Sequence, residues 1–134
     1  MRAVPDPPDA LTATIDLPPE IGSVPAARRV LTELLGSWAA EHFRDDANLL
    51  LSELVTNVVR HVSSRSKMVL EVRLSGPGLR VAVIDVSADL PTVTGTPSRA
   101  AGGHGMLLVA ALADRWGSEN HASGKRVWFE LRGA

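Results

Sequence analysis

The hydrophobic period of the chain changes from helical to extended within a few residues, and this change constrains the fold more than any other feature. Between Asp45 and Val62, apolar residues recur every three to four positions, which is typical of an amphipathic helix. After residues 63–66, apolar residues alternate with mostly polar ones; they are Met68, Leu70, Val72 and Leu74. Gly76-Pro77-Gly78 then leads into a second apolar segment that ends at Asp85, so the two segments are predicted to form a β-hairpin.

The remaining elements surround this helix and hairpin. Residues 11–17 alternate, are rich in β-branched side chains and meet Pro18-Pro19, which indicates a strand at a sheet edge. Ser23 is the expected N-cap of a first helix, and a third helix is expected to end near Asp114. Two closing strands are predicted at residues 115–119 and 125–131. This order favours an α+β fold, a two-layer α/β sandwich with helices on one face of a mostly antiparallel sheet.

Length and composition fit one domain. The chain has 134 residues, of which 45% are hydrophobic, so it can bury a core of its own but has no room for a second folded domain. Residues 11–134 are therefore predicted to form a single domain. Residues 1–10 contain three prolines and two aspartates without an apolar stretch, and we expect a disordered leader there.

Composition also excludes several classes of function. The net charge of −1 supplies no basic field that would attract nucleic acid or an anionic membrane. Trp38, Trp116 and Trp128 are accordingly expected to fill the core or an interface rather than to stack on bases. The absence of cysteine excludes disulfides and thiolate metal sites and is compatible with a reducing cytoplasm. No apolar run reaches the roughly 18 residues that span a bilayer.

Glu53 and Asn57 lie four residues apart in the long, strongly apolar helix. At this spacing they share one helical face, with Cβ atoms roughly 5 to 6 Å apart, close enough to serve one ligand. Glu53 is a candidate general base, and the amide oxygen of Asn57 is the kind of hard donor that Mg²⁺ prefers. The alternative is that both are ordinary polar residues on the solvent-exposed side of the helix. Arg60 and His61 lie about one helical turn beyond Asn57. They are candidates for binding phosphate oxygens, and the alternative is that they complement the negative end of the helix dipole.

Two further positions could contact a ligand. Asp85 ends the most apolar strand, where a carboxylate can accept a hydrogen bond from an exocyclic amine; the alternative is a helix or turn cap. Residues 102–105 are rich in glycine and precede the third helix, so their amides could face phosphates at its positive end. These glycines match neither the P-loop nor the dinucleotide-binding pattern.

The order of these features resembles a known arrangement. Glu53 and Asn57 on a helix, Asp85 at a strand end and the later glycine run resemble the N-box, G1 box and G2 box of the GHKL ATP-binding superfamily. Within it, residues 52–61 (SELVTNVVRH) and 111–117 (ALADRWG) are similar to small bacterial anti-sigma-factor serine kinases, especially single-domain actinobacterial regulators. The resemblance extends from about residue 13 to about residue 131.

The resemblance implies a Bergerat fold that binds ATP and Mg²⁺ between the helical layer and the sheet. By this likeness Glu53 is the catalytic base, Asn57 the magnesium ligand and Asp85 the partner of the adenine amino group. The other residues expected near the nucleotide phosphates are His61, Gly103, His104, Gly105 and Met106.

The resemblance also implies partners. The phosphate acceptor would be a serine or threonine of an anti-anti-sigma factor with the STAS fold. The alternative partner would be a sigma factor that this protein holds inactive, so that phosphorylation of the first partner frees the protein to bind the second. The family likeness further suggests a homodimer.

The chain departs from the family pattern at two places. The G1 box usually reads Asp-x-Gly-x-Gly, whereas Ser87 and Asp89 stand at its glycine positions here. The family often has Gly-x-Thr-Val near the C-terminus, and Arg126 stands at the threonine position. These departures favour a second hypothesis, a binding module that regulates by sequestration without kinase activity.

Overall fold

A five-stranded antiparallel sheet forms one layer of the molecule. The computed structural model describes residues 10–61, 67–86, 108–121 and 124–133. The strands are β1 (Leu11–Leu17), β2 (Lys67–Ser75), β3 (Gly78–Val86), β4 (Arg115–His121) and β5 (Gly124–Arg132). Their order in the sheet is β1-β2-β3-β5-β4, and every one of these pairings is antiparallel. The edge position predicted for residues 11–17 is confirmed.

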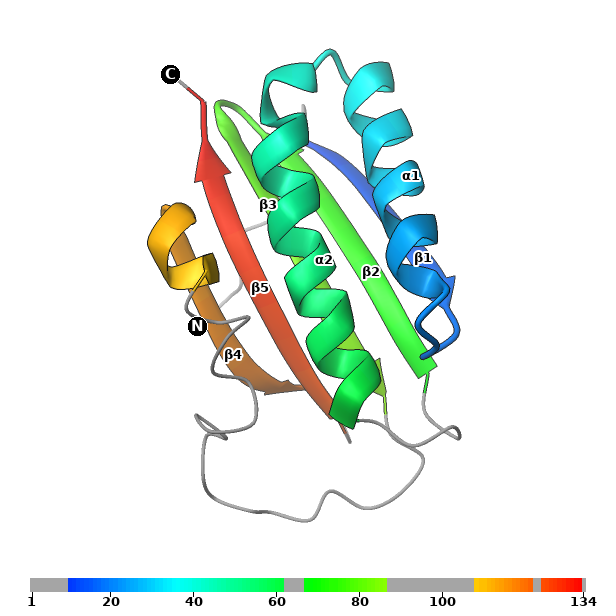
Figure 1. The fold of residues 1–134 in the computed structure, drawn as a ribbon. Helices are drawn as coiled ribbons and strands as arrows, with labels where there is room; N and C mark the ends of the chain where they lie inside the picture. Colours follow the sequence, from blue (N-terminus) through cyan, green and yellow to red (C-terminus); the bar gives the residue numbers. More distant parts are fainter. Residues whose placement is uncertain (1–9, 62–66, 87–107, 122–123, 134) are drawn as a thin grey trace.

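The described helices form the second layer, on one face of the sheet (Figure 1). They are α1 (Ser23–Ser37), the short 3-10 helix η1 (Glu41–Phe43), α2 (Arg44–His61) and a short helix at residues 108–112. In Figure 1, α1 lies over β1 and β2, α2 lies over β3 and β5, and the short helix lies beside β4. The predicted α+β sandwich is therefore confirmed. No helix in the described ranges is long and apolar enough to cross a membrane.

The core lies between the two layers. Leu31 and Leu35 of α1 and Leu50 and Leu54 of α2 are essentially inaccessible to solvent. They meet the inward-facing residues of the sheet, which are Leu70, Val72, Val81, Val83, Val127, Phe129 and Leu131. Burying each of these large side chains contributes roughly 1.5 to 3 kcal/mol relative to leaving it in water. This apolar layer fixes the positions of α2, β3 and β5.

The hairpin between β2 and β3 turns as the sequence predicts. Ser75 pairs with Gly78, which leaves a two-residue turn of Gly76 and Pro77. Gly76 has a φ of 58°, a conformation that glycine adopts without a steric penalty. The carbonyl of Pro77 accepts a hydrogen bond of 2.7 Å from the amide of Gly133, so the turn also holds the end of β5.

Two local predictions need correction. Ser23 is the first residue of α1 rather than its N-cap, which is Gly22. The Ser23 side chain is buried, and its hydroxyl donates a 2.5 Å hydrogen bond to the carbonyl of Pro18, so it satisfies the chain before the helix instead of a helix amide. The second difference is that α2 begins at Arg44 and ends at His61. Val62, residues 1–9 of the leader predicted at 1–10, and residues 122–123 lie outside the described residues.

The opposite face of the sheet, which no described helix covers, is called the uncovered face below. It carries the alternate residues of the strands, and many of them are charged; examples are Glu71, Arg73, Arg80, Arg126, Glu130 and Arg132. Trp128 lies there, beneath the guanidinium of Arg80. Of the three tryptophans, only Trp38 packs against the core, and Trp116 is 42% exposed. The expected place in the core is therefore confirmed for Trp38 and wrong for Trp116 and Trp128, for which an interface stays a prediction.

Candidate functional site

Glu53 and Asn57 lie together on one flank of α2. The residues of α2 that face the sheet are fully buried, whereas Glu53 and Asn57 are half-buried. The flank toward α1 is marked by Asn48, whose amide nitrogen donates a 2.9 Å hydrogen bond to the hydroxyl of Thr32. At 100° per residue, Glu53 and Asn57 lie roughly 140° and 180° around the helix from Asn48. They therefore face away from α1, toward the side of the molecule where β5 and β4 lie.

Asp85 provides an acceptor at the end of β3. It pairs with Met68 of β2 and with Lys125 of β5, one residue before β3 ends. Its Oδ1 atom is buried and has no hydrogen-bond partner among the described residues. Removal of the carboxyl group from water raises the pKa of Asp85, and the positive charge of Lys125 partly opposes this rise. A buried acceptor without a donor costs free energy, so this oxygen is suited to a donor that a ligand supplies.

Gly124 allows β5 to approach Asp85 closely. A Cβ atom at position 124 would lie only 1.6 Å from the carbonyl oxygen of Asp85. No side chain can occupy that space without moving one of the two strands. The glycine therefore fixes the separation of β3 and β5 at the residue that carries the candidate acceptor.

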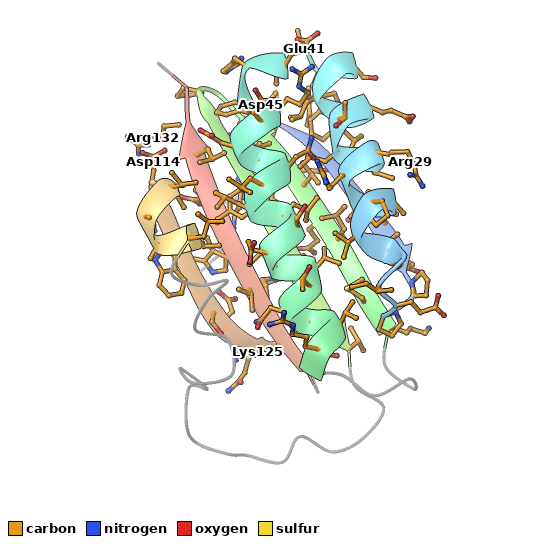
Figure 2. The ribbon with its side chains drawn as sticks, viewed as in Figure 1. Arg29, Glu41, Asp45, Asp114, Lys125 and Arg132 are labelled. Carbon is orange, nitrogen blue, oxygen red and sulfur yellow. The ribbon has the colours of Figure 1, made fainter. Side chains whose placement is uncertain are left out.

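The flank of α2 and the Asp85 carboxyl group belong to the same end of the molecule. Figure 2 shows Lys125 at the end of the sheet where the C-terminal end of α2 also lies. Because Asp85 is the register partner of Lys125, the acidic acceptor lies at this end too. Helix α2 packs directly on β3 and β5. Asn57, in the last turns of the helix, is thus brought to the same end of the sheet as Asp85.

Other predicted site residues are placed only in part. Arg60 is exposed near the end of α2, and His61 is the last residue of that helix. The side chain of His61 is not described. The predicted phosphate-facing residues Gly103, His104, Gly105 and Met106 lie outside the described residues, as do Ser87 and Asp89.

Lys125, rather than Arg126, is the basic residue on the site side of β5. Strand alternation directs Val127 and Phe129 into the core, so Lys125 shares their face and Arg126 points to the uncovered face. There the guanidinium of Arg126 pairs with Glu71 at 3.4 Å and with Glu119 at 3.2 Å. The side chain of Arg126 therefore points away from the face that carries Asp85. The buried alternation of β5 is the sequence signal that could have identified Lys125.

Comparison with known families identifies the class of protein. The sequence model of the histidine kinase-like ATPase domain matches residues 17–131. The chain belongs to this family, and its fold is that of a GHKL-type ATPase. A comparison with curated proteins found no match.

The residues of the site fit the nucleotide that this family binds. ATP carries an exocyclic amine on its adenine ring, and the unpartnered Oδ1 of Asp85 is an acceptor of the required kind. In the described ranges, no group of three or more histidine and acidic side chains is placed to hold a metal ion. A divalent ion would therefore depend on Asn57 together with oxygens from phosphate and water, which is the usual manner of Mg²⁺ binding.

Proposed function

We propose that the protein is an ATP-dependent serine/threonine protein kinase that also acts as an anti-sigma factor. The observation that carries this proposal is the unpartnered, buried oxygen of Asp85 at the end of the sheet where the last turns of α2, with Asn57, also lie. Glu53 precedes Asn57 by one turn on the same flank. Asp85 would recognise the nucleobase, and Glu53 and Asn57 would supply the catalytic base and the metal ligand that phosphoryl transfer uses.

Asp85 would select the nucleotide. Its carboxylate accepts a hydrogen bond from an adenine amino group, whereas guanine presents a carbonyl oxygen at the corresponding ring position and would be repelled. Lys125 modulates this interaction because its charge favours the ionised form of Asp85. We therefore expect ATP to bind and GTP to bind much more weakly.

Glu53 would act on the phosphate acceptor. Bound ATP supplies the phosphoryl group that is transferred. The carboxylate of Glu53 takes the proton from the attacking serine or threonine hydroxyl, and its half-buried position on α2 leaves it accessible to that hydroxyl. Asn57, one turn further along the same flank, would offer its amide oxygen to Mg²⁺.

The remaining contacts rest on sequence likeness. The segment before the short helix at 108–112 would approach the phosphates with Gly103, His104, Gly105 and Met106. His61 would lie beyond Asn57, at the end of α2. The partners would be a STAS-type anti-anti-sigma factor and a sigma factor, with a homodimer as the working unit in the cytoplasm. Residues 52–61 and 111–117 support this assignment through their similarity to anti-sigma-factor kinases.

A transfer assay with a matched control tests the kinase role. The chain is incubated with Mg-ATP and purified STAS-domain proteins, and phosphate transfer is followed by mass spectrometry. Loss of the general base in Glu53→Gln should slow transfer by about 10²-fold or more. ATP affinity, measured by calorimetry, should change by less than about threefold. Glu33→Gln removes an exposed carboxylate of α1 and should leave transfer unchanged.

Two outcomes would contradict the proposal differently. If calorimetry detects no ATP binding, the nucleotide role of Asp85 is wrong. If ATP binds but no Glu53-dependent transfer to any STAS protein occurs, the sequestering module remains. Arg126 pairs with Glu71 and Glu119 on the uncovered face, so its guanidinium would not itself block the nucleotide.

A further inference from the structure

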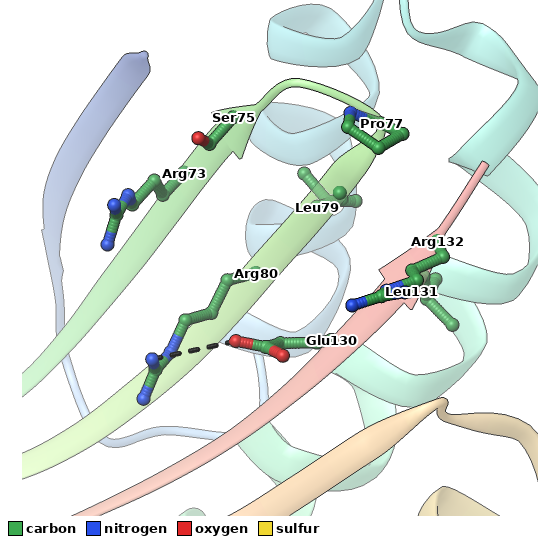
Figure 3. Close-up of a pocket in the computed structure, with 9 residues that line it drawn as sticks. Arg73, Ser75, Pro77, Leu79, Arg80, Glu130, Leu131 and Arg132 are labelled. Carbon is green, nitrogen blue, oxygen red and sulfur yellow. Dashed lines mark ion pairs between the residues drawn. The ribbon is translucent and has the colours of Figure 1, made fainter. Parts of the chain in front are cut away.

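A polar pocket lies on the uncovered face, away from the helices and from Asp85. It has a volume of about 380 Å³ and lies near the turn between β2 and β3, across β2, β3 and β5. Its charged lining residues are Arg73, Arg80, Glu130 and Arg132. Figure 3 shows Arg80 and Glu130 directed toward one another across the pocket. Three arginines thus share the lining with one carboxylate.

The carboxylate of the pocket is already engaged. Glu130 pairs with Arg80 at 3.6 Å and with Arg115 at 3.5 Å, so its charge is divided between two arginines. The guanidinium of Arg80 also lies 4.2 Å from the centre of the Trp128 ring, which holds it in a defined position. Arg132 is exposed, and its backbone amide donates a 2.7 Å hydrogen bond to the carboxylate of Asp114. Positive charge therefore exceeds negative charge at this end of the face.

Two further acids of the same face are engaged as well. Glu71 and Glu119 both pair with Arg126, which reaches across the small side chain of Ala82. The carboxylates of Glu71, Glu119 and Glu130 are thus paired on this face, and the exposed Arg132 adds positive charge beside them. A second copy of this face would bring surplus arginine against arginine, and like charges placed opposite one another oppose association.

We propose that the uncovered face binds an acidic segment of a protein partner, with its carboxylates in the pocket between Arg80 and Arg132. Guanidinium groups bind carboxylates in a two-pronged geometry, and the Trp128 ring that supports Arg80 offers an apolar surface beside them. This site is separate from the nucleotide side of the sheet, so it can be occupied whether or not ATP is bound. Its failure would leave the kinase proposal intact.

A fluorescent peptide of eight glutamates is a suitable probe. Binding to the full chain is measured by fluorescence polarisation at low salt. Arg132→Glu should weaken peptide binding by about tenfold or more, because it replaces a pocket cation with an anion. Arg29→Glu makes the same change of net charge at an exposed position of α1 (Figure 2) and should change binding by less than about twofold. Saturating Mg-ATP should leave the affinity unchanged.

Several results would overturn the proposal. Equal weakening by both variants would show that only net charge matters, and a lack of saturable binding by the full chain would exclude the site. Competition by Mg-ATP would assign the peptide to the nucleotide side. Binding that appears only after deletion of residues 1–9 would identify that segment, with Asp6 and Asp9, as the occupant. Self-association that Arg132→Glu abolishes in sedimentation would identify a second copy as the occupant.

Discussion

The two faces of the sheet are built from alternate residues of the same strands, yet they use different physical interactions. On the helix-covered face, side chains such as Phe129 and Val81 are inaccessible to solvent and contribute through apolar burial. On the uncovered face, Arg126, Glu130 and their neighbours form ion pairs between partly exposed groups. Such pairs contribute little free energy each, but they fix where charge lies. The first face therefore provides most of the stability, and the second is the face that we propose for binding a partner.

Adjacent residues of β5 allow the most direct test of this difference. Phe129 is fully buried, and the preceding residue, Trp128, lies on the uncovered face under Arg80. Phe129→Ala should lower the free energy of unfolding by about 3 to 5 kcal/mol, because it removes a large core side chain and leaves a cavity. Trp128→Ala should cost only about 1 to 2 kcal/mol, since the ring is partly exposed and covers other surface groups. Urea denaturation measures both. Equal losses would show that the uncovered face also carries core stability.

Gly124 tests the contact that joins β5 to Asp85. The Cβ atom of alanine at this position would overlap the carbonyl oxygen of Asp85, so the strands must separate. Gly124→Ala should therefore destabilise the domain by about 2 to 3 kcal/mol and weaken ATP binding together with it. Gly36→Ala is the matched control, because a Cβ there meets nothing within 4 Å and lies in α1. It should stabilise by about 0.5 to 1 kcal/mol. Thermal denaturation with and without Mg-ATP measures both variants. No loss of stability in Gly124→Ala, or a loss in Gly36→Ala, would contradict the prediction.

Arg126 tests the ion pairs of the uncovered face. Arg126→Met removes the cation between Glu71 and Glu119 but retains much of the aliphatic stem over the sheet. The expected loss is about 1 kcal/mol at low salt, and it should diminish as salt screens the pairs. ATP affinity should not change, since the side chain lies on the face away from Asp85. Arg44→Met, which breaks a highly exposed pair with Asp45, should cost less. A loss of ATP binding in Arg126→Met would show that the Arg126 side chain contributes to nucleotide binding.

The regular elements could be predicted because hydrophobic period determines them locally. The alternation of β2 and β3 and the helical pattern of α2 correctly predicted the sandwich, and the turn at Gly76 and Pro77 followed from its residue types. Ser23 was misassigned because sequence alone cannot show that its hydroxyl reaches the carbonyl of Pro18. Helix caps depend on the path of the preceding chain, and tertiary contacts set that path.

The candidate site was predictable only where one element carries it. Glu53 and Asn57 share a flank of α2 because helical geometry requires it. The pairing of Asp85 with Lys125 depends on the register of β3 and β5, which are joined through the long segment between β3 and β4. Register between strands distant in sequence is set by the whole core, so the sequence alone did not place Lys125 beside Asp85. The roles of residues 103–106 stay a prediction.

Asp85 combines burial with a charged group. Its replacement should change the free energy of unfolding less than the substitutions above. Burial raises the pKa of this carboxyl group in the folded protein above its ordinary value, despite Lys125. The folded state then holds the proton more tightly than the unfolded state, so stability falls as pH rises from the ordinary carboxyl range through the raised pKa. Asp85→Asn removes this penalty and should stabilise the domain at pH 7 by less than about 1 kcal/mol, because the group is partly exposed and screened. The gain should vanish near pH 3.

The matched control is Asp16→Asn, which removes one exposed carboxylate from β1. Denaturation of both variants between pH 3 and pH 8 checks the sign, and a gain that grows as the pH falls would contradict it. Asp85→Asn should also weaken ATP binding by about tenfold, because a neutral amide oxygen accepts a weaker hydrogen bond than a carboxylate does. A residue that costs stability when ionised and is needed in that form for a ligand is expected at a binding site rather than in a structural role. Higher stability with unchanged ATP affinity would therefore assign Asp85 no part in nucleotide recognition.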